Sequence, residues 1–141
     1  HGSVSIQYQR VLDRWFIWLL RCNVGVGTLD ESMKVYVAGP YTKGDVAVNV
    51  RDAIIATNEL LDLGYIPYCP HLSHFWHLVT PRPYEDWLAI DMEWLRECDT
   101  VLRLDGESSG ADLEVAEAKI LGMEVYYGKF GMNMLRLMSQ G

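Results

Sequence analysis

Asp91 is an acidic residue at a position where an apolar residue is expected. It falls in the apolar stripe of a helix predicted over residues 84–98, between Trp87 and Leu95, which lie about one turn before and one turn after it. Charged side chains are seldom buried unless something pairs with them. The position therefore indicates either an acid with a chemical task or a structural carboxylate that pairs with an arginine such as Arg82.

Glu114 is a second acid, about one turn into a helix that follows a predicted strand and a short loop. Gly110 lets a ligand approach the backbone at the start of this helix, and Ser108 or Ser109 can cap it. An acid near a helix N-terminus is favourable in itself because of the helix dipole. Asp112 already places a negative charge near the positive end of the helix dipole and completes a Ser-x-x-Asp cap. Glu114 is not needed for this purpose and can have another role.

Two carboxylates that meet at one sugar can break and form a glycosidic bond. One carboxylate attacks the carbon that carries the leaving group and forms a covalent ester, which water or another nucleophile later opens. The second carboxylate binds a sugar hydroxyl or handles the proton. This reaction class needs no metal, and we expect neither a metal nor a cofactor.

Strands and helices alternate along the chain from Lys34 onwards. Strands are predicted over 35–38, 65–68, 100–104 and 123–127, helices over 46–63, 84–98, 109–121 and 132–138, and a long loop over 69–83. This alternation is typical of a doubly wound α/β fold, flavodoxin- or Rossmann-like, with a mostly parallel sheet and helices on both faces. Ligands of such sheets lie beyond the carboxyl ends of the strands. Three loops are therefore candidates for the site: 39–45, 69–83 and 105–110.

The composition is that of an ordinary folded domain. A chain of 141 residues, half of them apolar, suffices for one domain with its own core. The formal net charge of −7 argues against binding to polymeric nucleic acid, which needs a basic face, although a few backbone amides and one cation can still hold a small anion. Three scattered cysteines, Cys22, Cys69 and Cys98, indicate reduced thiols and a cytoplasmic protein.

The first 32 residues differ from the rest and are interpreted separately. Successive parts are expected to be a tag remnant (1–3), an amphipathic helix (4–22) and a linker (24–32). The apolar run 15–20 is too short to span a membrane, so Trp15 and Trp18 indicate packing on the domain or on a partner subunit. A single α/β domain is expected over 33–141.

Three motifs together resemble those of the nucleoside 2-deoxyribosyltransferase superfamily. They are V-Y-V-A-G-P-Y-T-K-G at 35–44, I-D-M-E-W-L-R-E-C-D at 90–99 and S-S-G-A-D-L-E at 108–114. Their order and spacing match across roughly 34–127, which is nearly the whole domain. Each motif alone is a weak indication, whereas three in register are fairly specific. The motifs look most similar to those of the branch that resembles 2′-deoxynucleoside 5′-phosphate N-hydrolases.

The resemblance implies a role for each matching residue. Glu114 matches the glutamate that attacks the anomeric carbon of the deoxyribose. Asp91 matches the aspartate that contacts the sugar and assists at the leaving base, and Tyr36 matches a tyrosine that orients the nucleophile. The loop from Gly39 to Gly44 matches the loop that wraps the sugar and its 5′ end.

One departure from the family pattern bears on the substrate. Family members that take free nucleosides tend to carry an acid six residues before the nucleophile, where this chain has Ser108. A neutral hydroxyl at a helix N-terminus tolerates a phosphate, whereas a carboxylate repels it. Lys43 could add a cation, although Pro40-Tyr41 replaces the more open loop of the hydrolases. We therefore expect a nucleoside 5′-monophosphate in preference to a free nucleoside.

The loop over 69–83 contains three histidines, His71, His74 and His77, at three-residue spacing. They could ligate zinc, but the spacing is not that of a standard zinc motif. A second interpretation is that Phe75 and Trp76 stack on a base while His71 or His74 binds sugar or phosphate; a third is that the loop packs over the sheet by its own aromatic side chains. The residues expected to bind the substrate are Gly39, Pro40, Tyr41, Lys43, Gly44, His71, His74, Ser108, Ser109 and Gly110.

Three functions remain open at this point. The first is an enzyme that cleaves or exchanges the N-glycosidic bond of a nucleoside or nucleotide. The second is a nucleotide-binding module of the same fold without chemistry, and the third is a metallohydrolase that uses the histidine loop. The expected partners are a small-molecule nucleoside or nucleotide and further copies of the chain in a homodimer or higher homo-oligomer, because family sites are often completed by a neighbouring subunit.

Overall fold

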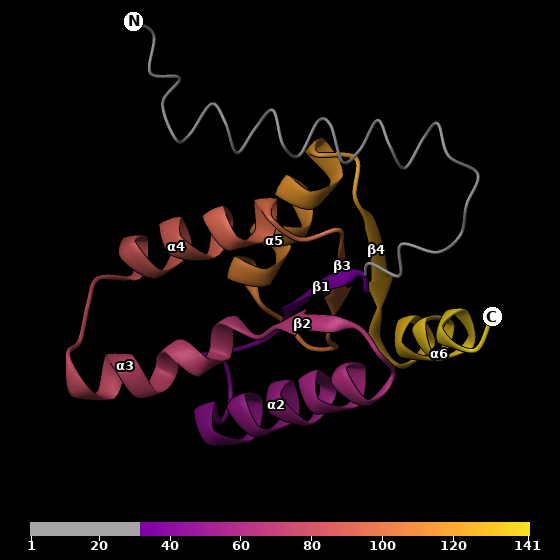
Figure 1. Ribbon diagram of the computed structural model, residues 1–141. Coiled ribbons are helices and arrows are strands. Elements are labelled where there is room, and N and C mark those ends of the chain that lie inside the picture. The colour runs from indigo at the N-terminus through magenta and orange to yellow at the C-terminus, as the bar shows by residue number, and fades with distance from the viewer. Residues whose placement is uncertain (1–31) are drawn as a thin grey trace, which may run out of the picture. The chain divides into compact units, whose positions relative to one another are not determined.

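The computed structural model describes residues 32–141 (Figure 1). The expected tag remnant, the amphipathic helix and all but the last residue of the linker lie outside the described residues. Ser32–Gly141 form one compact unit. Within this part of the chain, no helix combines the length and the apolar character that crossing a membrane requires.

The sheet has four strands, all parallel, in the order β2-β1-β3-β4. Their bounds are Lys34–Ala38 for β1, Ile66–Tyr68 for β2, Thr100–Arg103 for β3 and Glu124–Tyr127 for β4. β1 and β3 occupy the centre, and all their residues except Lys34 are buried. Strands buried on both faces are typical of parallel sheets that helices cover on both sides.

Two helices cover each face of the sheet, which confirms the doubly wound α/β fold. The longer helices are α2 (Val46–Asp62), α4 (Tyr84–Arg96), α5 (Ser109–Ile120) and α6 (Gly128–Ser139), and two short ones, η1 (Pro70–Leu72) and α3 (Ser73–Val79), follow β2. α2 and α6 pack against one face, and α4 and α5 pack against the other (Figure 1).

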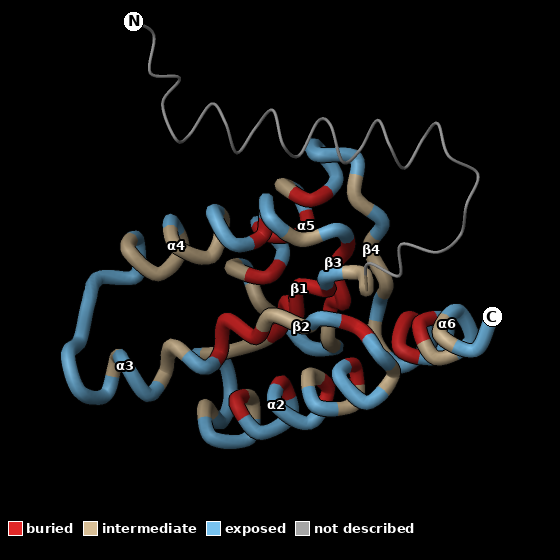
Figure 2. The backbone as a smooth tube through the Cα atoms, viewed as in Figure 1, coloured by how far each residue is buried: buried red, intermediate tan, exposed pale blue. Residues whose placement is uncertain are grey.

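The alternation of side chains along β1 divides the core into two layers. Val35 and Val37 point to the α2 and α6 side, whereas Tyr36 and Ala38 point to the α4 and α5 side. The buried residues accordingly concentrate along the central strands and the sheet-facing sides of the helices (Figure 2). Tyr36 thereby brings a hydroxyl into an otherwise apolar layer.

Two segments differ from the predictions. The stretch 69–83, expected to be a loop, contains η1 and α3, and α3 has no buried residue. The terminal helix begins at Gly128 and not at 132. Gly128 takes a positive φ of 56° beside Asp105, and Gly131 lies so close to Tyr126 that an added Cβ would stand 2.5 Å from its backbone carbon. Both glycines look like helix breakers in the sequence, but they serve close packing.

Candidate active site

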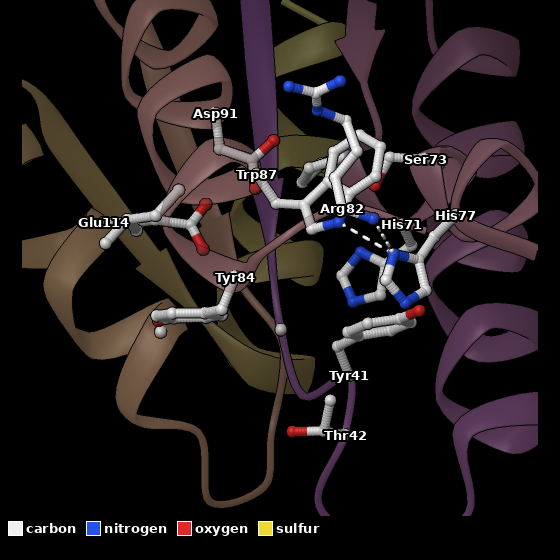
Figure 3. Close-up of a pocket in the computed structure, with 14 residues that line it drawn as sticks. Tyr41, Thr42, His71, Ser73, His77, Arg82, Tyr84, Trp87, Asp91 and Glu114 are labelled. Carbon is white, nitrogen blue, oxygen red and sulfur yellow. Dashed lines mark hydrogen bonds between the residues drawn. The ribbon is translucent and has the colours of Figure 1, made fainter. Parts of the chain in front are cut away.

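The strand order places a crevice between β1 and β3. The chain leaves β1 towards β2 on one side and returns to β3 on the other, and ligands of doubly wound sheets bind at this switch point. A cavity of about 200 Å³ lies there, lined by the loop after β1, by η1 and α3 after β2, and by α4 and α5 (Figure 3). All three loops expected from the sequence border this edge of the sheet.

Asp91 and Glu114 come from two different helices and line the same cavity (Figure 3). Asp91 lies in the middle of α4, and Glu114 lies in the second turn of α5, where only 7% of it is exposed. Among the described residues Asp91 forms no ion pair, and Arg82 pairs with Asp86, at 2.8 Å. The interpretation of Asp91 as a partner of Arg82 is therefore wrong.

Burial raises the pKa values of both carboxyls into the neutral range. The pKa of Asp91 rises to about 7 because the side chain is removed from water. The pKa of Glu114 rises to about 8: burial is the main cause, the charge of Asp91 adds to it, and Tyr36 and the charge of Arg103 act against it. Near pH 7 to 8 the pair therefore holds about one proton, so one carboxyl can act as acid while the other is ionised.

Tyr36 lies behind Glu114, fully buried, and does not line the cavity itself. Burial and the charges of Glu114 and Asp91 raise the pKa of Tyr36 far above its ordinary value, so its hydroxyl keeps its proton. This hydroxyl lies close enough to lower the pKa of Glu114, although neither it nor Glu114 Oε2 has a hydrogen bond of full geometry to a described residue. Tyr36 can therefore donate to the carboxylate of Glu114 once the latter is ionised.

The N-terminus of α5 forms one border of the cavity. Ser108 is its N-cap, and its Oγ accepts a hydrogen bond from Ala111 N at 3.1 Å. Gly110 lines the cavity, and a Cβ added there would lie 3.2 Å from the Tyr84 hydroxyl. Ser108 and Ser109 do not line the cavity by their side chains, so any ligand contact at this helix end involves the backbone.

Arg103 holds the loop before α5 in place. Its guanidinium is largely buried and donates to Leu104 O, to Gly106 O at 2.9 Å and to Asp112 Oδ1 at 3.1 Å. One side chain thus connects the end of β3, the following loop and the first turn of α5. Arg103 is not among the site residues predicted from the sequence, although an arginine at the end of an apolar strand is a signal for such a role, because a buried cation needs several acceptors.

The loop after β1 lies against the loop after β3. Gly39 lines the cavity, and a Cβ added there would stand 3.1 Å from Leu104, so the leucine side chain would have to shift slightly. Asn49 Nδ2 donates to Tyr41 O at 2.9 Å and to Lys43 O at 2.8 Å, which fixes the course of the loop. Of the loop residues expected to bind the substrate, Gly39 and Tyr41 line the cavity.

The other loop residues expected to bind the substrate lie outside the cavity lining. Lys43 forms an ion pair with Glu107 at the surface. Pro40 packs on Gly106, where an added Cβ would approach Pro40 Cγ to 2.8 Å. Gly44 is exposed, with a φ of 85° that lets the loop turn into α2.

The three histidines have different partners. His71 Nε2 is 2.9 Å from Pro40 O, and His74 Nδ1 is 2.7 Å from the Tyr41 hydroxyl. His77 Nδ1 accepts hydrogen bonds from the Trp87 indole at 3.0 Å and from the backbone N–H of Arg82 at 3.2 Å. His71 and His77 line the cavity and His74 does not. Nowhere in residues 32–141 do three His, Cys, Asp or Glu side chains gather as metal ligands would.

Several residues that line the cavity are not among those predicted from the sequence. Phe75 and Trp76, predicted to stack on a base, are about half exposed and do not line the cavity, and Trp87 of α4 supplies the indole instead. From the sequence, Trp87 belongs to the apolar stripe of its helix, but an aromatic residue at a helical spacing is equally compatible with a core and with a pocket position. The remaining lining residues that were missed are Thr42, Pro70, Ser73, Arg82, Tyr84 and Leu88.

The family described as "Domain of unknown function (DUF7768)" matches residues 33–128. No curated protein matches the chain. The matched region runs from just before β1 to just after β4, and it contains both carboxyls and every residue that lines the cavity. Since the match covers well over half of the sequence, the chain belongs to the DUF7768 family.

Proposed function

We propose that the protein cleaves or exchanges the N-glycosidic bond of a (deoxy)nucleoside or nucleoside 5′-monophosphate through a covalent glycosyl-glutamate intermediate. The observation that carries the proposal is the convergence of Asp91 and Glu114 in one cavity, with the pKa values of both raised towards neutrality. The motif resemblance to the nucleoside 2-deoxyribosyltransferase superfamily supports it, and membership in that superfamily is part of the proposal.

The proposed reaction has two steps. In the first, the pair reacts in the form whose single proton lies on Asp91, which is the less populated of the two one-proton forms because the pKa of Asp91 is the lower one. Ionised Glu114 attacks C1′ of the sugar, the bond from C1′ to the base nitrogen breaks, and Asp91 gives its proton to the departing base. In the second, water or the nitrogen of another base attacks C1′, the ester to Glu114 breaks, and the Asp91 carboxylate takes up the proton released. The Tyr36 hydroxyl donates to the Glu114 carboxylate and orients it.

A nucleoside 5′-monophosphate is the substrate we favour. Ser108 caps α5 without adding charge, so the first N–H groups of this helix remain suited to an anion. Lys43 forms an ion pair with Glu107, but both side chains are largely exposed. Such a surface ion pair is weak, so Lys43 can leave Glu107 and pair with a phosphate.

Replacement of Glu114 tests the central claim. Glu114→Ala should abolish base release from deoxynucleoside monophosphates, because it removes the carboxylate on which the proposed ester forms. The measurement is chromatography of the products, with and without a second free base, which also distinguishes hydrolysis from transfer. Glu117→Gln is the matched control, since Glu117 lies on the same helix outside the cavity and pairs with Arg96.

Two outcomes would count against the enzyme. Base release that persists in Glu114→Ala would reject the nucleophile. A wild-type protein that binds nucleotides and releases no base would identify the alternative, a non-catalytic nucleotide-binding module of the same fold.

We further propose that the protein works as a homodimer or higher homo-oligomer in the cytoplasm. Apolar side chains such as Phe130 and Leu137 of α6 and Leu78 and Val79 of α3 remain mostly exposed in the single chain, and exposed apolar groups of this kind favour association. Cys69 and Cys98 are free thiols, as a reducing compartment permits.

A further inference from the structure

Three buried side-chain nitrogen or oxygen atoms in residues 32–141 lack a hydrogen-bond partner. They are the Tyr36 hydroxyl, Glu114 Oε2 and His71 Nδ1. A buried polar atom without a partner costs free energy, and native proteins keep few of them. Tyr36 and Glu114 are residues of the proposed reaction, and His71 lines the same cavity as Glu114 (Figure 3). The three atoms thus mark one site, and His71 is the member that the proposed reaction does not use.

The hydrogen bond of the other ring nitrogen determines where the proton of His71 lies. Nε2 is 2.9 Å from the carbonyl oxygen of Pro40, and because a carbonyl only accepts, Nε2 carries the proton. Burial lowers the pKa of His71, so the ring is neutral near pH 7. Nδ1 consequently holds a lone pair and can only accept a hydrogen bond.

His77, beside it in the cavity, has the opposite arrangement. Its Nδ1 accepts from the Trp87 indole and from the backbone N–H of Arg82. In a neutral ring the proton then lies on Nε2, which is a donor. The two histidines of the cavity wall therefore differ in what they require of a ligand, and only His71 requires a donor.

We propose that His71 Nδ1 accepts a hydrogen bond from an O–H or N–H group on the nucleoside part of the ligand. The group is either a sugar hydroxyl or an N–H of the base. A dianionic phosphate is excluded, because its oxygens are themselves acceptors. The inference rests on the proposed function, since it names what the same cavity recognises, and it makes His71 a specificity residue for the nucleoside and not for its 5′ group.

Two substitutions separate the two nitrogens of the ring. His71→Gln places an amide N–H near the position of Nε2, so it keeps the hydrogen bond to Pro40 and removes the acceptor. His71→Asn places an amide oxygen near the position of Nδ1 and loses the bond to Pro40, which makes it the matched control. Thermal unfolding of both variants establishes that each is folded.

Calorimetry of binding measures the effect without turnover if every protein also carries Glu114→Ala. The four common deoxynucleoside 5′-monophosphates are compared first. The tightest is then tested beside its 2′,3′-dideoxy form, which lacks the sugar hydroxyl, and beside a form whose base N–H groups are methylated. We expect His71→Gln to lower the affinity for the unmodified nucleotide about tenfold, and His71→Asn to lower it less. One of the two modified ligands should bind with the same affinity to the protein with His71 and to His71→Gln.

The results distinguish this inference from the proposed function. Equal binding of the parent nucleotide with and without His71→Gln would overturn the role of His71 and leave the catalytic proposal standing. An equal loss for all three ligands would also overturn it, because the loss would then not depend on a donor. Failure of every nucleotide to bind the protein would overturn both.

Discussion

At the scale of single residues, the site is defined by where protons lie. Asp91 and Glu114 have pKa values of about 7 and about 8, chiefly because both are buried. Protonated Tyr36 lies next to Glu114, and neutral His71 has a free acceptor. An arrangement with one shared proton between two carboxyls is suited to glycosyl transfer, in which one carboxylate attacks and one acid protonates the leaving group.

Asp91→Asn tests this division of labour. An amide cannot give up a proton to the departing base, so turnover should fall by about 10²- to 10⁴-fold. The wild-type kcat/KM should follow a narrow bell with limbs near pH 7 and pH 8. In Asp91→Asn the alkaline limb should disappear, and the single remaining limb should follow the ionisation of Glu114 alone. An unchanged rate and pH profile would make Asp91 a structural residue.

At the scale of elements, α5 and the loop before it determine where Glu114 lies. Ser108 caps it, Gly110 leaves room beneath the Tyr84 hydroxyl, and Glu114 follows in the second turn. Arg103, at the end of β3, ties the preceding loop to the first turn of this helix. The position of Glu114, the proposed nucleophile, therefore depends on the junction between β3 and α5.

Ser108→Asp tests the proposed preference for a phosphate. Aspartate caps a helix about as well as serine, so the fold should persist. Its negative charge should repel a 5′-phosphate and thereby lower the ratio of kcat/KM for nucleoside monophosphates to that for free nucleosides by about 10- to 100-fold. Ser108→Asn, an equally good cap without charge, is the control, and an unaltered ratio in Ser108→Asp would discard the phosphate preference.

At the scale of the whole molecule, the site lowers the stability of the fold. In the folded protein the pKa values of Asp91 and Glu114 lie above those of exposed carboxyls, so the folded state binds more protons than the unfolded state between about pH 4 and pH 8. The free energy of unfolding contributed by these groups therefore falls as the pH rises through this window. Residues placed for chemistry commonly have such a cost.

Glu114→Gln should consequently stabilise the protein at alkaline pH. Glutamine fills the same volume and never ionises, so at pH 9 the variant should exceed the wild type by about 1–4 kcal/mol, and the difference should shrink towards pH 4. Urea unfolding at a series of pH values measures this, with Glu117→Gln as the control on the same helix. A difference that stays constant with pH would contradict the raised pKa of Glu114.

Local sequence features were sufficient to predict the fold class and the edge of the sheet where the cavity lies. Buried strands, helical periodicity and glycines after helices are properties of short segments, and alternating strands and helices allow few topologies. Asp91 and Glu114 could be identified in the same way. Asp91 interrupts the apolar stripe of its helix, and Glu114 is a second acid near a helix N-terminus that Asp112 already supplies with one. The order β2-β1-β3-β4 then brings their helices together on one face of the sheet.

Only the tertiary structure decided which neighbours complete the site. Arg82 pairs with Asp86 and not with Asp91. The indole that lines the cavity is that of Trp87 and not that of Trp76. Lys43 forms an ion pair with Glu107. The same holds for His71, whose single acceptor follows from a contact with the carbonyl of Pro40, thirty-one positions earlier in the chain. Such partners depend on packing between segments distant in sequence, and no periodicity or turn pattern within one segment encodes them.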